Sequence, residues 1–158
     1  MNNWLEQLAA EWYEYQGYLI RRNKRLDKAA RGGYHHEYDL IAYCPKSREL
    51  VHVEAGQVTD SWAKTTENFK RKFAGSKENC CREFEGLAEP VSFRMIALLA
   101  TGSRRSSRRL EIPNVETLYL YELFAQIVER VEPEHWWTKG VPEQFPTLRT
   151  IQALEFYR

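Results

Sequence analysis

Few cysteines and no long apolar run occur in the sequence, and these absences exclude several classes of protein. The 158 residues include three cysteines, Cys44, Cys80 and Cys81, and the last two are adjacent. The odd number and the adjacent pair argue against a disulfide framework, and no Cys-x-x-Cys or Cys/His spacing indicates a zinc site. The longest apolar run, residues 95–100, is far shorter than the roughly 20 residues that cross a bilayer. We therefore expect no membrane partner.

The signatures of several cofactor-binding and targeting classes are also missing. No Gly-rich phosphate loop or dinucleotide fingerprint is present, and Ser103, Ser106 and Ser107 lack the context of a nucleophile elbow. The first residues, MNNWLE, lack a basic region followed by an apolar stretch. This start predicts no secretory signal, so we expect the protein to be cytoplasmic.

The composition is that of one globular domain. Hydrophobic residues make up 43% of the chain and charged residues 28%, and a chain of this length can bury a substantial core. No composition shift marks a linker. We therefore expect a single domain over residues 1–158, with its core at about residues 3–120 and a helical, aromatic extension at about residues 121–158.

Basic residues gather in two stretches, although the formal net charge is only +1. Local basic patches on a neutral protein are compatible with nucleic-acid contact, and solvated loop charge explains either patch alone about equally well. The residues that we expect to contact nucleic acid, most simply DNA, are Arg21, Arg22, Lys24, Arg25, Arg104 and Arg105.

Hydrophobic periodicity predicts an alternation of helices and strands. The predicted helices are residues 4–16, 59–73, 121–131 and 148–157, and the predicted strands are residues 18–23, 38–44, 49–55, 93–100 and 115–120. The second and third strands form a hairpin, and the glycine-containing stretch 27–33 reads as a loop. A hairpin followed by a helical crossover to a buried strand predicts an α/β fold, with helices on both faces of a mixed sheet.

The predicted hairpin places two carboxylates opposite each other. If residues 45–48 form the turn, Cys44 pairs with Glu49, and counting outward brings Asp39 opposite Glu54. Directly opposed side chains share a face of the sheet, with Cβ atoms about 4.5–5.5 Å apart. Two carboxylates there repel each other, and a shared Mg²⁺ ion would turn the repulsion into binding. Alternatively, Asp39 caps its strand and Glu54 pairs with an arginine, and a bulge would shift the register.

Three segments in the first half of the chain occur in an order and spacing that resemble one superfamily. They are EQLAAEWYEYQGYLIRRN (residues 6–23), EYDLIAY (37–43) and ELVHVE (49–54). The sequence resembles the PD-(D/E)XK nuclease superfamily and is most similar to its small bacterial resolvase-like members. The resemblance implies a restriction-endonuclease-like fold, with an αβββαβ core and a mixed sheet flanked by helices.

By this resemblance, four residues would form a metal site. Glu6 matches the carboxylate of the first helix, Asp39 the strand aspartate and Glu54 the acid of the E-x-K element. In the superfamily these residues hold Mg²⁺ or Mn²⁺, with the main-chain carbonyl after the glutamate, here that of Ala55, as a further ligand. The resemblance therefore implies metal-dependent phosphodiester hydrolysis on DNA, with Asp39 and Glu54 as catalytic residues.

The sequence departs from the superfamily at its lysine. The position two residues after Glu54 holds Gly56, and Gln57 follows. Gln57 can hydrogen-bond to a catalytic water but has no charge, whereas Lys64, about two turns into the next helix, could return an ammonium group or could be a surface residue. The chain is therefore either a nuclease that uses Gln57 and Lys64, or a catalytically inactive module that retains the fold and binds nucleic acid or protein.

Weaker expectations concern His52 and the C-terminal region. His52 lies two residues from Glu54 and shares its strand face, where it would line a cleft or pack into the core. The aromatic-rich C-terminal region could supply a homodimer interface, because many resolvase-like relatives pair as dimers.

Overall fold

Five strands form one mixed sheet, in which the spatial order of the strands follows their order in the sequence. The computed structural model describes residues 4–28, 34–101 and 106–158. The strands are β1 (Leu19–Lys28), β2 (Tyr34–Cys44), β3 (Glu49–Gln57), β4 (Ser92–Ala100) and β5 (Val115–Tyr119). β2 is antiparallel to both β1 and β3, whereas β4 is parallel to both β3 and β5.

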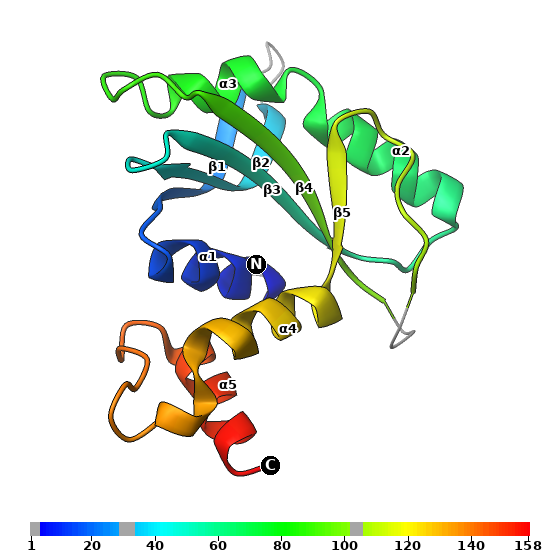
Figure 1. Ribbon diagram of the computed structural model, residues 1–158. Coiled ribbons are helices and arrows are strands. Elements are labelled where there is room, and N and C mark those ends of the chain that lie inside the picture. Colours follow the sequence, from blue (N-terminus) through cyan, green and yellow to red (C-terminus); the bar gives the residue numbers. More distant parts are fainter. Residues whose placement is uncertain (1–3, 29–33, 102–105) are drawn as a thin grey trace.

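Helices cover both faces of this sheet (Figure 1). They are α1 (Trp4–Tyr15), α2 (Trp62–Phe73), α3 (Ser76–Arg82), α4 (Leu120–Val131), the 3₁₀ helix η1 (Pro133–His135) and α5 (Pro146–Phe156). α1 and α4 lie on one face, and α2 and α3, which connect β3 to β4, lie on the other. The predicted α/β class and the mixed sheet flanked by helices are confirmed. Within the part of the chain that the structure describes, no helix could span a membrane.

Alternating side chains divide the core between the two faces of the sheet. The strand residues packed on the α1 face are Leu40, Ala42, Val51, Val53, Ile96 and Leu98. The strand residues packed on the α2 and α3 face are Ile41, Tyr43, Leu50, Ala97 and Leu99. The apolar run in β4 is thus buried on both sides, as expected for a strand with parallel neighbours.

Two local features differ from the sequence-based expectations. β1 continues to Lys28, which pairs with Tyr34 of β2, so the loop predicted at 27–33 is wrong for its first two residues, and residues 29–33 lie outside the description. Pairing with β2 extends this charged strand, which has no apolar alternation of its own. α3 was not predicted, because a helix of seven residues is too short to show a periodic stripe.

One buried carboxylate fastens the C-terminal segment to α1. Glu11 accepts hydrogen bonds from the backbone N–H groups of Thr147 (2.8 Å) and Leu148 (3.2 Å), and from the hydroxyl of Thr147 (2.7 Å). These N–H groups belong to the first turn of α5, where they lack partners within the helix and where negative charge is stabilised. The predicted C-terminal extension therefore packs on the first helix of the core.

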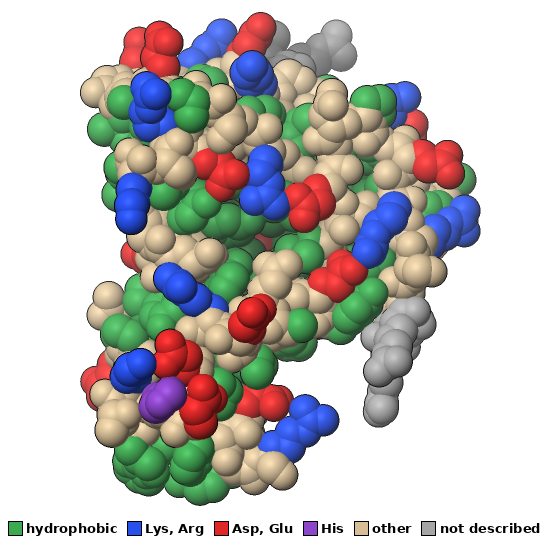
Figure 2. Space-filling view, viewed as in Figure 1, with side chains coloured by type: hydrophobic (Ala, Val, Ile, Leu, Met, Phe, Trp, Pro, Cys, Tyr) green, Lys and Arg blue, Asp and Glu red, His purple; other side chains and the backbone are tan. Residues whose placement is uncertain are grey.

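A hydrophobic patch lies at the C-terminal end of the molecule. Figure 2 shows hydrophobic side chains at the bottom of the view, where Figure 1 places the segment that follows α4, and acidic and basic side chains interspersed over the rest of the visible face. The large hydrophobic residues exposed in this segment are Trp137, Leu154, Phe156 and Tyr157. The homodimer expected from this region remains a prediction.

Gly56 of β3 lies so close to α2 that an added methyl group would press on a ring. A Cβ atom at this position would lie 3.1 Å from Cζ of Phe69, which is closer than ordinary van der Waals contact. Because the Phe69 ring is buried, it has little room to move. We expect Gly56→Ala to lower the free energy of unfolding by about 1 kcal/mol, measured by urea denaturation.

A double-mutant cycle with Phe69→Leu tests the cause of this loss. Phe69→Leu alone is destabilising, because it leaves a cavity in the core. The smaller side chain makes room for the added methyl group, so the double variant should lose less stability than the sum of the two single losses. Strictly additive losses would show that Gly56 and Phe69 are not in contact.

Candidate functional site

Two neighbouring strands separate at the point where the predicted carboxylate pair stands. The β2–β3 ladder keeps the predicted register and ends at Leu40 opposite Val53. Beyond this pair, β2 continues beside β1 and β3 continues beside β4, so the sheet forks. One step further along the same register, Asp39 and Glu54 stand on the two sides of the fork.

Asp39 bridges the fork through its side chain. Its Oδ2 accepts a hydrogen bond from the backbone N–H of Ala55 (2.9 Å), and its own N–H lies 3.4 Å from Oε1 of Glu54. Because the N–H and C=O of a strand residue point toward the same neighbour, the Ala55 carbonyl, the predicted fourth metal ligand, also faces the fork. Among the described residues, Oδ1 of Asp39 has no hydrogen-bond partner.

A lysine of α2 contacts both carboxylates. Nζ of Lys72 lies 2.6 Å from Oε2 of Glu54 and 3.2 Å from Oδ2 of Asp39. The ammonium group therefore joins the two sides of the fork, and the helix that follows β3 supplies the positive charge that Gly56 cannot.

Burial, repulsion and the lysine together set the protonation of the pair. Burial and the neighbouring Glu54 charge raise the pKa of Asp39 to about 7. Burial also raises the pKa of Glu54, but the hydrogen bond from His52 and the charge of Lys72 outweigh it and leave that pKa below its usual range. Burial lowers the pKa of Lys72, and attraction to Glu54 and Asp39 reverses this and raises it. At neutral pH Glu54 and Lys72 are therefore charged, and Asp39 is about half protonated.

His52 is completely buried and bonds to Glu54. Its Nε2 lies 2.7 Å from Oε1 of Glu54, and its Nδ1 lies 2.5 Å from Oγ of Ser76. The imidazole packs between the rings of Tyr38 and Phe73, with centroids 4.3 and 5.0 Å away. Of the two expectations for this residue, the structure shows the one in which it packs into the core.

Glu6 of α1 lies within electrostatic range of the pair without bonding to it. Among the described residues, no hydrogen bond joins Glu6 to Asp39 or Glu54. Burial raises the pKa of Glu6, while the charges of Lys72 and Arg22 lower it and that of Glu54 raises it. The structure therefore brings Glu6 near the site, and its role as a ligand remains a prediction.

Neither of the two residues predicted to replace the lysine lies at the carboxylates. Gln57 is exposed at the end of β3, and strand alternation turns it to the face opposite Glu54. Lys64 pairs instead with Asp60, at 3.0 Å on the exposed side of α2. The cation at the pair is Lys72, about two helical turns later.

The predicted basic residues of β1 are each engaged within the chain. Their partners are Phe84 for Arg21, Gln7 for Arg22, Glu83 for Lys24 and Glu37 for Arg25. Because side chains alternate along a strand, Arg21 and Arg22 point to opposite faces of the sheet. These four residues therefore do not form one continuous patch, and Arg104 and Arg105 lie outside the described residues.

The carboxylate pair fits a small divalent cation that keeps part of its own ligand shell. Within residues 4–28, 34–101 and 106–158, no group of three or more His, Cys, Asp or Glu side chains is arranged to hold a metal ion. Mg²⁺ needs fewer protein ligands than that, since it takes one or two carboxylates with waters and substrate phosphates. Asp39, Glu54 and the Ala55 carbonyl provide this donor set.

Comparison with known proteins does not assign the site. A scan against protein-family models and a search of curated proteins found no match to the chain. The candidate site therefore rests on the arrangement of Asp39, Glu54 and Lys72.

Two residues of the site, Lys72 and Ser76, were not predicted from the sequence. The signal that could have found Lys72 is the direction of the crossover helix. After β3, the chain turns and α2 runs back along the sheet, so residues late in α2 return to the level of Glu54, whereas Lys64 is too early. For Ser76 we find no comparable signal in the sequence.

Removing the charge of Lys72 should cost more stability than removing that of Lys64. Lys72→Met leaves two carboxylates at the fork without a partner cation, and we expect a loss of about 1–3 kcal/mol near pH 8, since the half-exposed ammonium is partly screened. Lys64→Met breaks one exposed ion pair and should change stability by less than about 0.5 kcal/mol. Urea denaturation of both variants measures the difference, and equal effects would contradict the assignment of Lys72 to the pair.

Asp39 should make stability decrease as the pH rises toward neutrality. Its pKa of about 7 in the folded protein exceeds the ordinary value of 3.8, so the folded state binds this proton more tightly. The contribution is fully present below about pH 4 and is lost as the pH rises through 7. Asp39→Asn cannot ionise, and we expect it to be about 1–3 kcal/mol more stable than wild type near pH 8.

The exposed aspartate Asp60 provides the matched control for this measurement. Asp60→Asn removes an exposed carboxylate without touching the fork, so its stability should follow pH as that of wild type does. Urea denaturation between about pH 4 and pH 8 compares the three proteins. A wild-type pH dependence in Asp39→Asn would show that the Asp39 pKa is not raised.

Proposed function

We propose that the protein is a metal-dependent nuclease-like hydrolase that cleaves phosphodiester bonds in DNA. The observation that carries the proposal is the meeting of three groups at the strand fork, where Lys72 contacts both Asp39 and Glu54 at 3.2 and 2.6 Å. Two carboxylates and one lysine are the charged groups that the resemblance to PD-(D/E)XK nucleases requires. The restriction-endonuclease-like core is part of this proposal, and the element order α1-β1-β2-β3-α2-α3-β4 supports it.

In this proposal Asp39, Glu54 and the Ala55 carbonyl hold Mg²⁺ or Mn²⁺, with Glu6 as a further carboxylate nearby. When bound, the ion supplies positive charge that stabilises the phosphorane-like transition state and the attacking oxygen. Asp39 must lose its proton to bind the ion, so its raised pKa makes binding stronger as the pH rises through 7.

Lys72 takes the role that the missing motif lysine would have. Once a divalent ion satisfies the two carboxylates, the ammonium group no longer has to do so and can hydrogen-bond to the phosphate or to the attacking water. Its side chain is 39% exposed, so a substrate can approach it from solvent, whereas Glu54 is wholly buried behind it.

Substrate binding by the basic residues of β1 requires an exchange of partners. Lys24 now pairs with Glu83 at 2.7 Å and Arg25 with Glu37 at 3.5 Å. Both pairs are partly exposed, and exposed pairs are weak, so DNA phosphates can compete for the cations. We propose that these side chains and Arg104 and Arg105 contact the DNA backbone, which makes binding strongly dependent on salt.

One observation favours a second function, that of a catalytically inactive DNA-binding module. Lys72 already compensates the charge of Asp39 and Glu54, so the pair is electrostatically satisfied without any divalent ion. If Mg²⁺ and Mn²⁺ cannot displace the ammonium, the fold would bind DNA without cutting it.

Cleavage of branched, single-stranded and double-stranded DNA with Mn²⁺ distinguishes the two functions. We expect wild type to cleave at least one of these substrates, and Asp39→Asn and Lys72→Gln to be slower by about 100-fold or more, the scale of a lost acid–base or charge-stabilising group. Lys64→Gln is the matched control and should cleave like wild type. DNA binding without cleavage of any substrate, and without thermal stabilisation by Mn²⁺, would reject the nuclease and favour the inactive module.

A further inference from the structure

A series of hydrogen bonds connects the wall of a surface cavity to Oε1 of Glu54. It begins at Ser76, the first residue of α3, whose Oγ lies 2.5 Å from Nδ1 of His52. It continues from Nε2 of His52 to Oε1 of Glu54, and the other oxygen, Oε2, bonds to Lys72. Ser76, His52 and Glu54 are each at most 2% exposed. The bonds between them are therefore made away from water, where they are strong.

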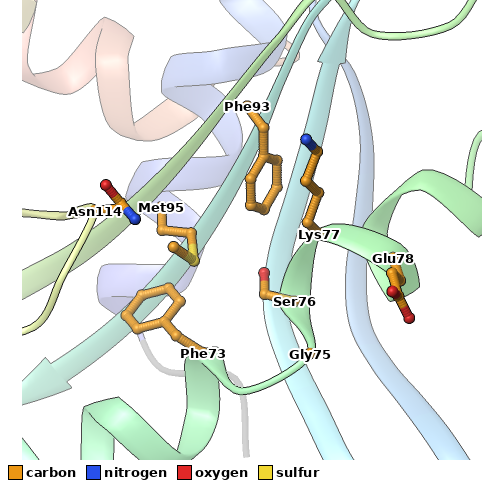
Figure 3. Close-up of a pocket in the computed structure, with 8 residues that line it drawn as sticks. All are labelled: Phe73, Gly75, Ser76, Lys77, Glu78, Phe93, Met95 and Asn114. Atoms are coloured by element: carbon orange, nitrogen blue, oxygen red, sulfur yellow. The ribbon is translucent and has the colours of Figure 1, made fainter.

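Ser76, where this series of hydrogen bonds begins, forms part of the wall of a cavity of about 640 Å³. Figure 3 shows the Ser76 side chain pointing toward the ring of Phe93, with Phe73 and Met95 beside it. The series of hydrogen bonds thus links a cavity on the α2 and α3 side of the sheet to the carboxylate site.

For a neutral His52 ring, the chemistry of the groups determines the direction of each bond. An ionised carboxylate only accepts hydrogen bonds, so Nε2 of His52 carries the proton that it shares with Glu54. In the neutral ring Nδ1 is then an acceptor, and the hydroxyl of Ser76 donates to it. The charge of Glu54 therefore selects the Nε2–H tautomer of His52, and Ser76 anchors the other ring nitrogen. The rings of Tyr38 and Phe73 hold the imidazole plane.

We propose that His52 is a positioning residue, oriented by Ser76, which holds Oε1 of Glu54 so that Oε2 faces the cation in the site. In the metal-free protein that cation is Lys72, and the extension to a divalent ion rests on the proposed function. Without the bond from His52, Glu54 could rotate about its terminal torsion, which is broad. Groups that orient a ligating side chain in this way typically change metal affinity 10- to 100-fold.

Mn²⁺ titration of the full chain and four variants tests the positioning role. His52→Leu removes the donor and should raise the Kd for Mn²⁺ by about 10- to 100-fold, whereas His52→Gln retains an N–H donor and should recover part of the loss. Ser76→Ala leaves the ring in place but unanchored and should give a smaller rise. Ser76→Thr keeps the hydroxyl and should bind Mn²⁺ like wild type.

NMR of ¹⁵N-labelled histidine in the metal-free protein gives a readout that does not depend on metal binding. We expect His52 to carry its proton on Nε2 in wild type and in both Ser76 variants. We expect the ¹⁵N resonance of Nδ1 to move toward that of an unbonded acceptor nitrogen in Ser76→Ala but not in Ser76→Thr. A Ser76 that only filled space would leave the Nδ1 resonance unchanged in all three proteins.

The outcomes separate this proposal from the nuclease proposal. A wild-type proton on Nδ1, no change of the Nδ1 resonance in Ser76→Ala, or unchanged Mn²⁺ affinity in folded His52→Leu would overturn the positioning role. If wild type binds no Mn²⁺ but Ser76→Ala still shifts the Nδ1 resonance, the nuclease proposal fails, and His52 positions Glu54 toward Lys72 alone. If His52→Leu does not fold, the two Ser76 variants decide the question.

Discussion

Two carboxylates at a fork in a sheet are stable only with a positive charge beside them, and the packing of α2 against β3 depends on this constraint. Glu54 has no exposed surface, and an unpaired buried charge would cost several kcal/mol. Lys72 and His52 bond to its two oxygens from opposite sides. α2 must therefore pack close to β3, and the glycine at position 56 allows it to do so.

The hairpin could be predicted from the sequence because its register depends on local information. A four-residue turn determines every pair that follows it, so Asp39 and Glu54 could be placed opposite each other by counting. The same reasoning failed for Lys72, because the helix reaches the fork only after the chain has crossed between layers. The direction of the crossover helix indicates that late residues of α2 return to the fork, but the exact residue depends on packing between the layers. The expectation therefore named Lys64, whereas Lys72 of the same helix contacts the pair.

The longer β1 and the additional α3 have a similar explanation. Lys28 joins a strand because β2 offers backbone partners, although its neighbours carry no alternating pattern. α3 is too short for periodicity, yet it places Ser76 against His52. Both features are stabilised by contacts with distant segments, which local propensity does not describe. Ser76, the site residue that lies on α3, was therefore not predicted from the sequence.

The position of Lys72 on a helix gives the site a freedom that a lysine on β3 would not have. Adjacent strands are bound by a ladder of backbone hydrogen bonds, whereas packed helices can slide by an ångström or two while keeping their contacts. Displacement of α2 would withdraw the ammonium group and leave the carboxylates and the ladder in place. The position of this charge is thus set by side-chain packing between α2 and the sheet, and not by the backbone ladder that holds the carboxylates.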